Sequence, residues 1–164
     1  MTDPIHTLSH RTVGLPLRAR IPYATYVLVA VNVAVLVATK VAGEGLHDWV
    51  LDRLAQDRLE VWHGEWWRLL TATFVHDGWG HLLLNMLLLL SAGGPVERLL
   101  GAWRFTVLYL VSGLSGALCF QAFASGSVGI GASGAILGVF GAYLLAWAMA
   151  TSRSRRAARW KLLR

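Results

Sequence analysis

Hydrophobic residues divide the sequence into four long apolar segments separated by polar stretches. The apolar segments run over about 21–41, 80–100, 103–123 and 130–149. Each is close to the roughly 20 residues that an α-helix needs to cross the hydrocarbon core of a bilayer. The pattern therefore predicts four transmembrane helices and an all-α fold.

The first apolar segment follows a basic flank, as the hydrophobic part of a signal peptide also does. It is longer than that part usually is, and three further spans come after it. We therefore interpret residues 21–41 as a retained transmembrane helix within a membrane domain that covers 21–150.

The polar stretches differ from one another in character. Residues 1–20 have no apolar periodicity and predict an N-terminal tail, whereas 151–164 form a strongly basic C-terminal tail. Residues 44–79 contain most of the acidic side chains and several tryptophans, a residue type that favours the boundary between membrane and water. We expect this stretch to lie on the outer membrane surface as short amphipathic pieces.

Composition and charge place this chain among integral membrane proteins. Of its 164 residues, 55% are hydrophobic and 15% are charged, against about 45–50% and about 25% in soluble domains. The net charge of +6 comes from basic residues that mostly fall on the side of the two tails. By the positive-inside rule, both termini are expected in the cytoplasm, across a bacterial inner or plasma membrane. The lipid bilayer thus accounts for the basic charge, and no nucleic-acid partner is expected.

Three polar residues are predicted at a similar depth near the outer end of two spans. His81 and Asn85 are four positions apart and share a helix face, and Ser133 stands near the start of the last span. Each residue by itself is compatible with helix packing or with a hydrogen bond between helices. Three of them at one level are more than packing requires, because polar side chains inside a membrane are costly.

These residues belong to a longer series of motifs. The series comprises Glu65-Trp66-Trp67-Arg68, then His76, His81 and Asn85, then Glu97 and Gly101, and finally Gly131-Ala132-Ser133-Gly134-Ala135 with Gly138. Its order and spacing resemble those of the rhomboid intramembrane serine proteases across about residues 22–149. The resemblance implies a polytopic, rhomboid-like helical bundle, of which this chain contains four of the usual six transmembrane helices.

The resemblance also implies a role for each motif residue. Ser133 would be the nucleophile of an endopeptidase that cleaves transmembrane helices of membrane-protein substrates. His81, Asn85 and the backbone N–H of Ser133 would stabilise the oxyanion. His76, Gly131 and Gly134 are candidate supporting residues. Neither a metal nor another cofactor is implied.

The general base departs from the rhomboid pattern. Rhomboids take this base from a histidine on their sixth helix, whereas all six histidines of this sequence precede Ser133. Without a base, serine proteases lose activity on the order of 10⁶-fold, so these 164 residues alone are expected to be inactive.

Three interpretations of the missing base remain. The chain is a fragment of a longer rhomboid, a non-catalytic short form that binds membrane helices as a scaffold, or an enzyme whose base is His81 or comes from a partner chain. A small transporter or channel subunit is a further alternative, which would require solute flux that depends on His81 or Asn85.

Overall fold

Four long helices dominate the structure, a computed structural model that describes residues 21–126 and 128–162. They are α1 (Tyr23–Ala42), α5 (Trp79–Leu100), α6 (Ala102–Phe123) and α7 (Ser133–Leu162). Each contains a segment long and apolar enough to cross a membrane. The prediction of an all-α polytopic membrane protein is therefore confirmed. The predicted tail at residues 1–20 lies outside the described residues.

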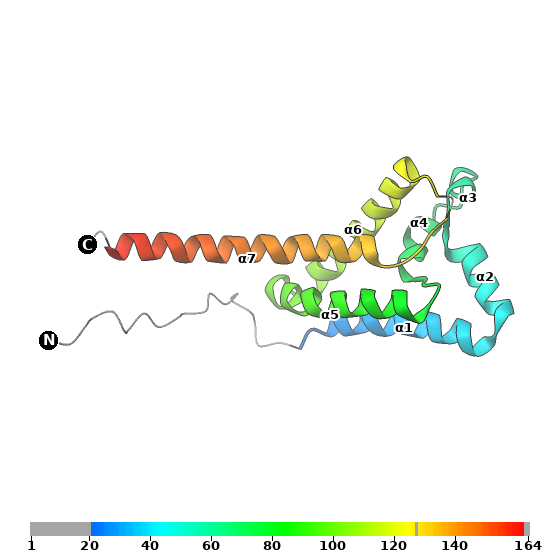
Figure 1. The fold of residues 1–164 in the computed structure, drawn as a ribbon, viewed down its shortest axis with the longest axis horizontal. Coiled ribbons are helices and arrows are strands. Elements are labelled where there is room, and N and C mark those ends of the chain that lie inside the picture. Colours follow the sequence, from blue (N-terminus) through cyan, green and yellow to red (C-terminus); the bar gives the residue numbers. More distant parts are fainter. Residues whose placement is uncertain (1–20, 127, 163–164) are drawn as a thin grey trace.

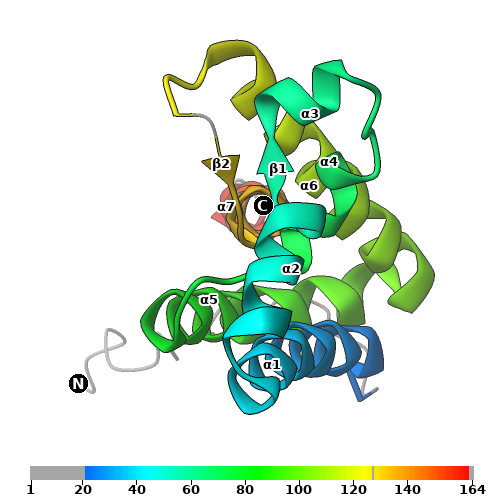
Figure 2. The same ribbon diagram turned by 90° about the vertical axis from the view of Figure 1, so that its right-hand side faces the viewer.

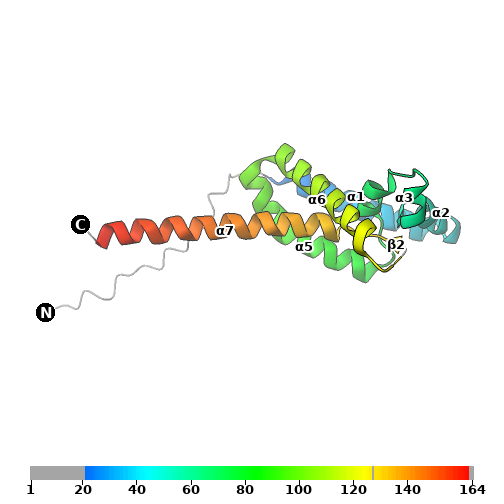
Figure 3. The same cartoon turned by 90° about the horizontal axis from the view of Figure 1, so that it is seen from above.

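The long helices form a bundle in which α7 extends beyond its neighbours (Figures 1 and 3). Helices α1, α5 and α7 run along the long axis of the molecule, and α6 crosses them obliquely. The helix α7 begins at Ser133, later than the predicted start of the last span, and it continues as far as Leu162 through most of the basic segment. Residues 128–132, which precede it, adopt a short strand and a turn instead of a helix.

The polar stretch between α1 and α5 folds into short elements at one end of the bundle. They are α2 (Glu44–Leu54), β1 (Gln56–Asp57), α3 (Arg58–Trp62), α4 (Arg68–Thr71) and the 3₁₀ helix η2 (Ala72–Phe74). Strand β1 pairs antiparallel with β2 (Val128–Gly129), which Figure 2 shows beside the start of α7. The pairing joins this stretch to the segment that leads into Ser133.

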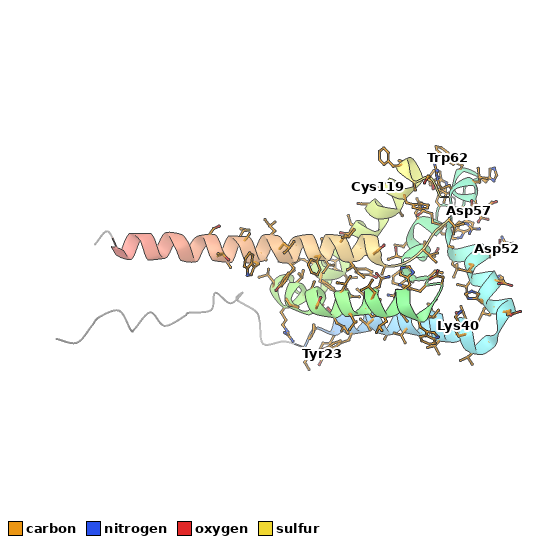
Figure 4. The ribbon with its side chains drawn as sticks, in the orientation of Figure 1. Tyr23, Lys40, Asp52, Asp57, Trp62 and Cys119 are labelled. Carbon is orange, nitrogen blue, oxygen red and sulfur yellow. The ribbon has the colours of Figure 1, made fainter. Side chains whose placement is uncertain are left out.

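Figure 4 labels side chains at the two ends of α1 and in the short elements. Asp52, Asp57 and Trp62 lie at the same end as Lys40, and Tyr23 marks the opposite end of α1. Trp62 and Trp67 are exposed there, with 72% and 51% of their surface accessible. An end that combines exposed indole rings with acidic groups has the composition of a membrane–water boundary.

A buried carboxylate connects α1 to α5. Glu97 of α5 accepts hydrogen bonds from the backbone N–H groups of Ala24 (2.9 Å) and Thr25 (2.7 Å) and from the Thr25 hydroxyl (2.7 Å). These backbone groups belong to the first turn of α1, where N–H groups have no partner within the helix. The negative charge also complements the positive end of the helix dipole, so Glu97 fixes where α1 begins relative to α5.

The core lies between α1, α5, α6 and α7. Its fully buried members include Leu89, Phe105, Tyr109, Ala135 and Val139. Small residues on α6 and α7 bring these two helices close together, which fixes the depth at which Ser133 begins α7.

Candidate functional site

The candidate nucleophile, Ser133, is the first residue of α7 and is exposed. The position follows from the residues before it, because Gly131 has a φ of +105°, a conformation that residues with a Cβ rarely adopt. The Gly131 N–H donates to the Ala72 carbonyl oxygen (2.9 Å), which attaches this turn to η2. The N–H groups of the first helical turn therefore lie around Ser133, where a negative charge is favoured.

Two of the predicted oxyanion residues lie directly against this turn. A Cβ added to Gly131 would be 2.7 Å from both Cε1 and Nε2 of His81 and 3.5 Å from Nδ2 of Asn85. His81 and Asn85 come from the first turns of α5, and Asn85 is buried. The structure thus brings His81, Asn85 and the backbone two residues before Ser133 together from separate parts of the chain.

His76 anchors the side chain of Asn85. The Asn85 Nδ2 donates to Nε2 of His76 at 3.0 Å, and the two residues are both buried. A carboxamide nitrogen has two hydrogens, so one of them remains for a second acceptor. His76 therefore fixes the orientation of Asn85.

The same interaction requires a neutral His76. The pKa of His76 is lowered from 6.5 to about 4, chiefly by burial and also by the nearby His81, whereas the Phe74 backbone and Asp77 oppose the shift. At neutral pH the ring is thus uncharged, and its Nε2 can accept the hydrogen bond from Asn85. The His76 and His81 rings also meet edge to face, with centroids 5.0 Å apart.

A cavity of about 540 Å³ adjoins Ser133. It lies between α6, the start of α7 and the β1–β2 pair. Its lining comprises Gln56, Ala72, Thr73, Gly113, Gly116, Ala117, Cys119, Phe120, Val128, Gly129, Ile130, Gly131, Ser133, Gly134 and Leu137. The space is large enough for several side chains of an extended peptide, and Ser133 lies on its wall.

Gly134 has a packing role in this arrangement. A Cβ at Gly134 would be 3.2 Å from the Cα of Gly116 on α6, and a Cβ at Gly116 would be 2.9 Å from the Cα of Gly134. The two backbones are therefore in contact, and Gly134 determines the distance between α6 and α7 beside the cavity.

The motif Glu65-Trp66-Trp67-Arg68 stabilises the wall of the site. The buried Arg68 guanidinium pairs with Glu65 and donates to the Ala55 carbonyl oxygen (2.9 Å). This holds the chain just before Gln56, which itself donates to the Ala117 carbonyl oxygen (2.9 Å) and to Oε1 of Gln121 (3.2 Å). The motif thus supports β1, and β1 in turn supports the strand that precedes Ser133.

Sequence reasoning did not identify two residues of this region. Asp77 contacts His81 over a spacing of four residues, which is a readable signal at a helix start. Gln56 lines the cavity through contacts with residues more than 60 positions away, and no local pattern indicates them.

The fold and this arrangement define a helical membrane protein with a serine at a helix N-terminus beside a buried histidine and asparagine pair. The Rhomboid domain model matches residues 63–162, more than half of the chain. This protein therefore belongs to the rhomboid family, whose members include intramembrane proteases.

Several relatives of known name are similar to the chain. Rhomboid protease GluP of Bacillus subtilis (strain 168) is 37% identical over 75% of this chain and 24% of its own length. Putative rhomboid protease YdcA of the same organism is 40% identical over 57% of this chain and 47% of its own length. Rhomboid-type serine protease 2 of Emericella nidulans is 33% identical over 49% of this chain and 16% of its own length. The chain thus matches at most about half the length of these relatives.

Proposed function

We propose that the chain contributes the nucleophile and the oxyanion-binding residues of an intramembrane serine endopeptidase. The observation that carries the proposal is the position of Gly131, two residues before Ser133, where an added Cβ would meet both His81 and Asn85. Membership of a family with named serine proteases supports the same reading. The substrates would be transmembrane segments of membrane proteins, which reach the cavity beside Ser133.

In this mechanism, the Ser133 Oγ attacks the scissile carbonyl carbon and passes its proton to a base. The carbonyl oxygen becomes negatively charged and is stabilised by Asn85, His81 and the Ser133 N–H. Collapse of this intermediate releases the amine with a proton and leaves an acyl-serine. Water then gives a proton to the base and attacks the ester carbon, and the Ser133 Oγ takes that proton back as it leaves. The second product is a carboxylic acid, which ionises to a carboxylate.

The residues described so far do not include the general base that accepts the proton of Ser133. Every histidine of the sequence precedes Ser133, so residues 1–164 contain no histidine after the proposed nucleophile that could serve as the base. We propose a group outside these residues, because His81 and Asn85 face the turn where oxyanion donors are needed. A scaffold that binds membrane helices without cutting them is the corresponding non-catalytic function.

A fluorophosphonate probe tests the proposal, because it reacts covalently with activated serines. The expected result is labelling of the intact native protein that disappears in Ser133→Ala and falls on the order of 10²-fold in Asn85→Ala. Ser152→Ala is the matched control, because Ser152 is an exposed serine in the same helix whose hydroxyl donates to the Ala148 carbonyl oxygen. Absence of Ser133-dependent labelling, together with retained binding of a transmembrane peptide, would establish the scaffold instead.

The membrane orientation forms part of this proposal. We place both termini in the cytoplasm and the β1–β2 pair at the outer face, in a bacterial inner or plasma membrane. The support is the excess of basic residues on the side of the two termini and the acidic groups at the opposite end. The active serine would then lie near the outer surface, where water can reach it.

A further inference from the structure

Asp77 makes a directed contact with one edge of the His81 ring. The Nδ1 of His81 lies 3.2 Å from Oδ1 of Asp77, and the two residues are four positions apart across the start of α5. The side chains of Asp77 and His81 are 63% and 34% exposed, so the pair contributes little to stability. The contact instead affects which nitrogen of the His81 ring carries a proton.

The other edge of the ring faces the turn before Ser133. The Nε2 and Cε1 atoms are the ones that a Cβ at Gly131 would meet, at 2.7 Å. His81 therefore contacts Asp77 with one nitrogen and presents the other to the proposed oxyanion site.

A carboxylate only accepts hydrogen bonds, so the nitrogen that faces Asp77 has to carry a proton. A neutral imidazole has a single N–H, which leaves Nε2 without a proton as long as Nδ1 keeps one. A cationic ring has a proton on both nitrogens. In this geometry Nε2 is thus a donor in the charged ring and an acceptor in the neutral ring.

We propose that Asp77 is a positioning residue that holds a proton on Nδ1 of His81, so that the Nε2 proton at the oxyanion site is present only when the ring is charged. The inference rests on the proposed function and adds to it a dependence of the site on pH. Asp77 thereby makes one oxyanion donor weaken as the pH rises.

Few titratable groups of the described residues face His81 and could add to this pH dependence. Among the described residues, the titratable groups that face the ring are Asp77 and His76, both from the segment before α5. The turn before α7 faces it with Gly131, which has no charge. His76, with its pKa lowered to about 4, stays neutral between about pH 5 and 8, where histidines ordinarily change charge.

The substitution Asp77→Asn changes the hydrogen-bonding group beside Nδ1 of His81 while keeping the shape of the side chain. Asparagine has the same shape, but its NH₂ group can donate to Nδ1. The neutral ring can then keep its single proton on Nε2. The variant is therefore expected to retain the Nε2 donor at both low and high pH.

Nitrogen NMR of the ring nitrogens of His81 tests this directly in the full chain in detergent micelles, with His81→Gln used to assign the signals. Across a pH series, the wild type should show a protonated Nε2 where the ring is charged and an unprotonated Nε2 where the ring is neutral. Asp77→Asn should show a protonated Nε2 in both states. Asp52→Asn, another exposed aspartate of the same end, should behave as the wild type. A neutral wild-type ring protonated on Nε2, or an Asp77→Asn pattern identical to the wild type, would overturn the proposal.

Probe labelling provides a second readout in the intact native protein. The ratio of the labelling rate of Asp77→Asn to that of the wild type should rise with pH, on the order of 10-fold, a part of what one oxyanion donor contributes. The ratio cancels the pH dependence of the base, and a ratio constant with pH would contradict the inference. If Ser133 does not react at all, the proposed function fails, whereas the NMR result still decides the role of Asp77.

Discussion

At the scale of single residues, the site depends on one glycine that meets two requirements at once. Gly131 has a positive φ, and its Cα approaches the His81 ring too closely for a side chain. A larger residue would have to change the backbone of the turn and displace His81 together. Both changes would move the oxyanion candidates away from Ser133.

We therefore expect Gly131→Ala to abolish most of the Ser133 labelling. The strained backbone and the contact at 2.7 Å together should also lower the free energy of unfolding by about 1–3 kcal/mol. Labelling rates and denaturant unfolding in detergent measure the two effects. Gly126→Ala is the control, because a Cβ at Gly126 has open space around it. Equal behaviour of the two variants would show that the turn tolerates a side chain.

His76 makes the stability of the protein depend on pH. Its pKa is lowered from 6.5 to about 4 in the folded state, so the unfolded chain binds more protons between these values. The stabilisation is complete above about pH 6.5 and is lost as the pH falls toward 4.

Over that interval the wild type should lose up to about 3 kcal/mol more than His76→Gln, which has no ring to titrate. Unfolding in detergent at a series of pH values measures the difference. Parallel curves for the two proteins would contradict the role assigned to His76.

At the scale of elements, the contact between α6 and α7 sets the position of the nucleophile. A Cβ at Gly138 of α7 would lie 2.0 Å from Oγ and 2.3 Å from Cβ of Ser112 on α6. The helices cannot accommodate even a methyl group there without moving apart. Such a movement would shift the start of α7 and open the cavity beside Ser133.

Gly138→Ala should thus destabilise the bundle by about 1–3 kcal/mol, the usual cost of overpacking. The double variant Gly138→Ala/Ser112→Gly should recover most of this loss, because it removes the side chain that the methyl group meets. Gly141→Ala, one turn further along α7 where a Cβ has open space, is the control. Thermal unfolding in detergent compares these three variants with the wild type. A double variant no more stable than Gly138→Ala would show that the contact with Ser112 does not cause the loss of stability.

At the scale of the whole molecule, the two ends of the bundle differ in chemistry. The end with β1, β2 and the short helices has acidic groups and exposed tryptophans, and the helix α7 leads from this end toward the basic C-terminal segment. This asymmetry supports a single orientation in the membrane, with Ser133 near the outer surface.

Single cysteines introduced into Cys119→Ala test the orientation. Ser125→Cys, in the link between α6 and β2, should react with a membrane-impermeant maleimide in intact cells. Ser152→Cys, toward the other end of α7, should react only after the membrane is opened. The reverse pattern would place both termini outside and would contradict the proposed orientation.

The sequence by itself determined the class of protein, and it predicted which residues form the candidate site. Apolar segments of spanning length predict membrane helices, because the bilayer core has no water to pair with backbone groups and a helix pairs them within its own segment. The spacing of His76, His81 and Asn85 and the glycines around Ser133 are also readable locally.

Only the tertiary structure decided how these parts meet. The pairing of Gln56 with Gln121 spans 65 positions, and the bond of Thr25 to Glu97 spans 72. The contact of Gly131 with His81 likewise depends on how α5, α6 and α7 pack. Hydrophobic periodicity indicates which face of a helix is buried, but it does not indicate which other helix that face packs against. Close packing of small residues between particular helices makes that choice, and with it the geometry around Ser133.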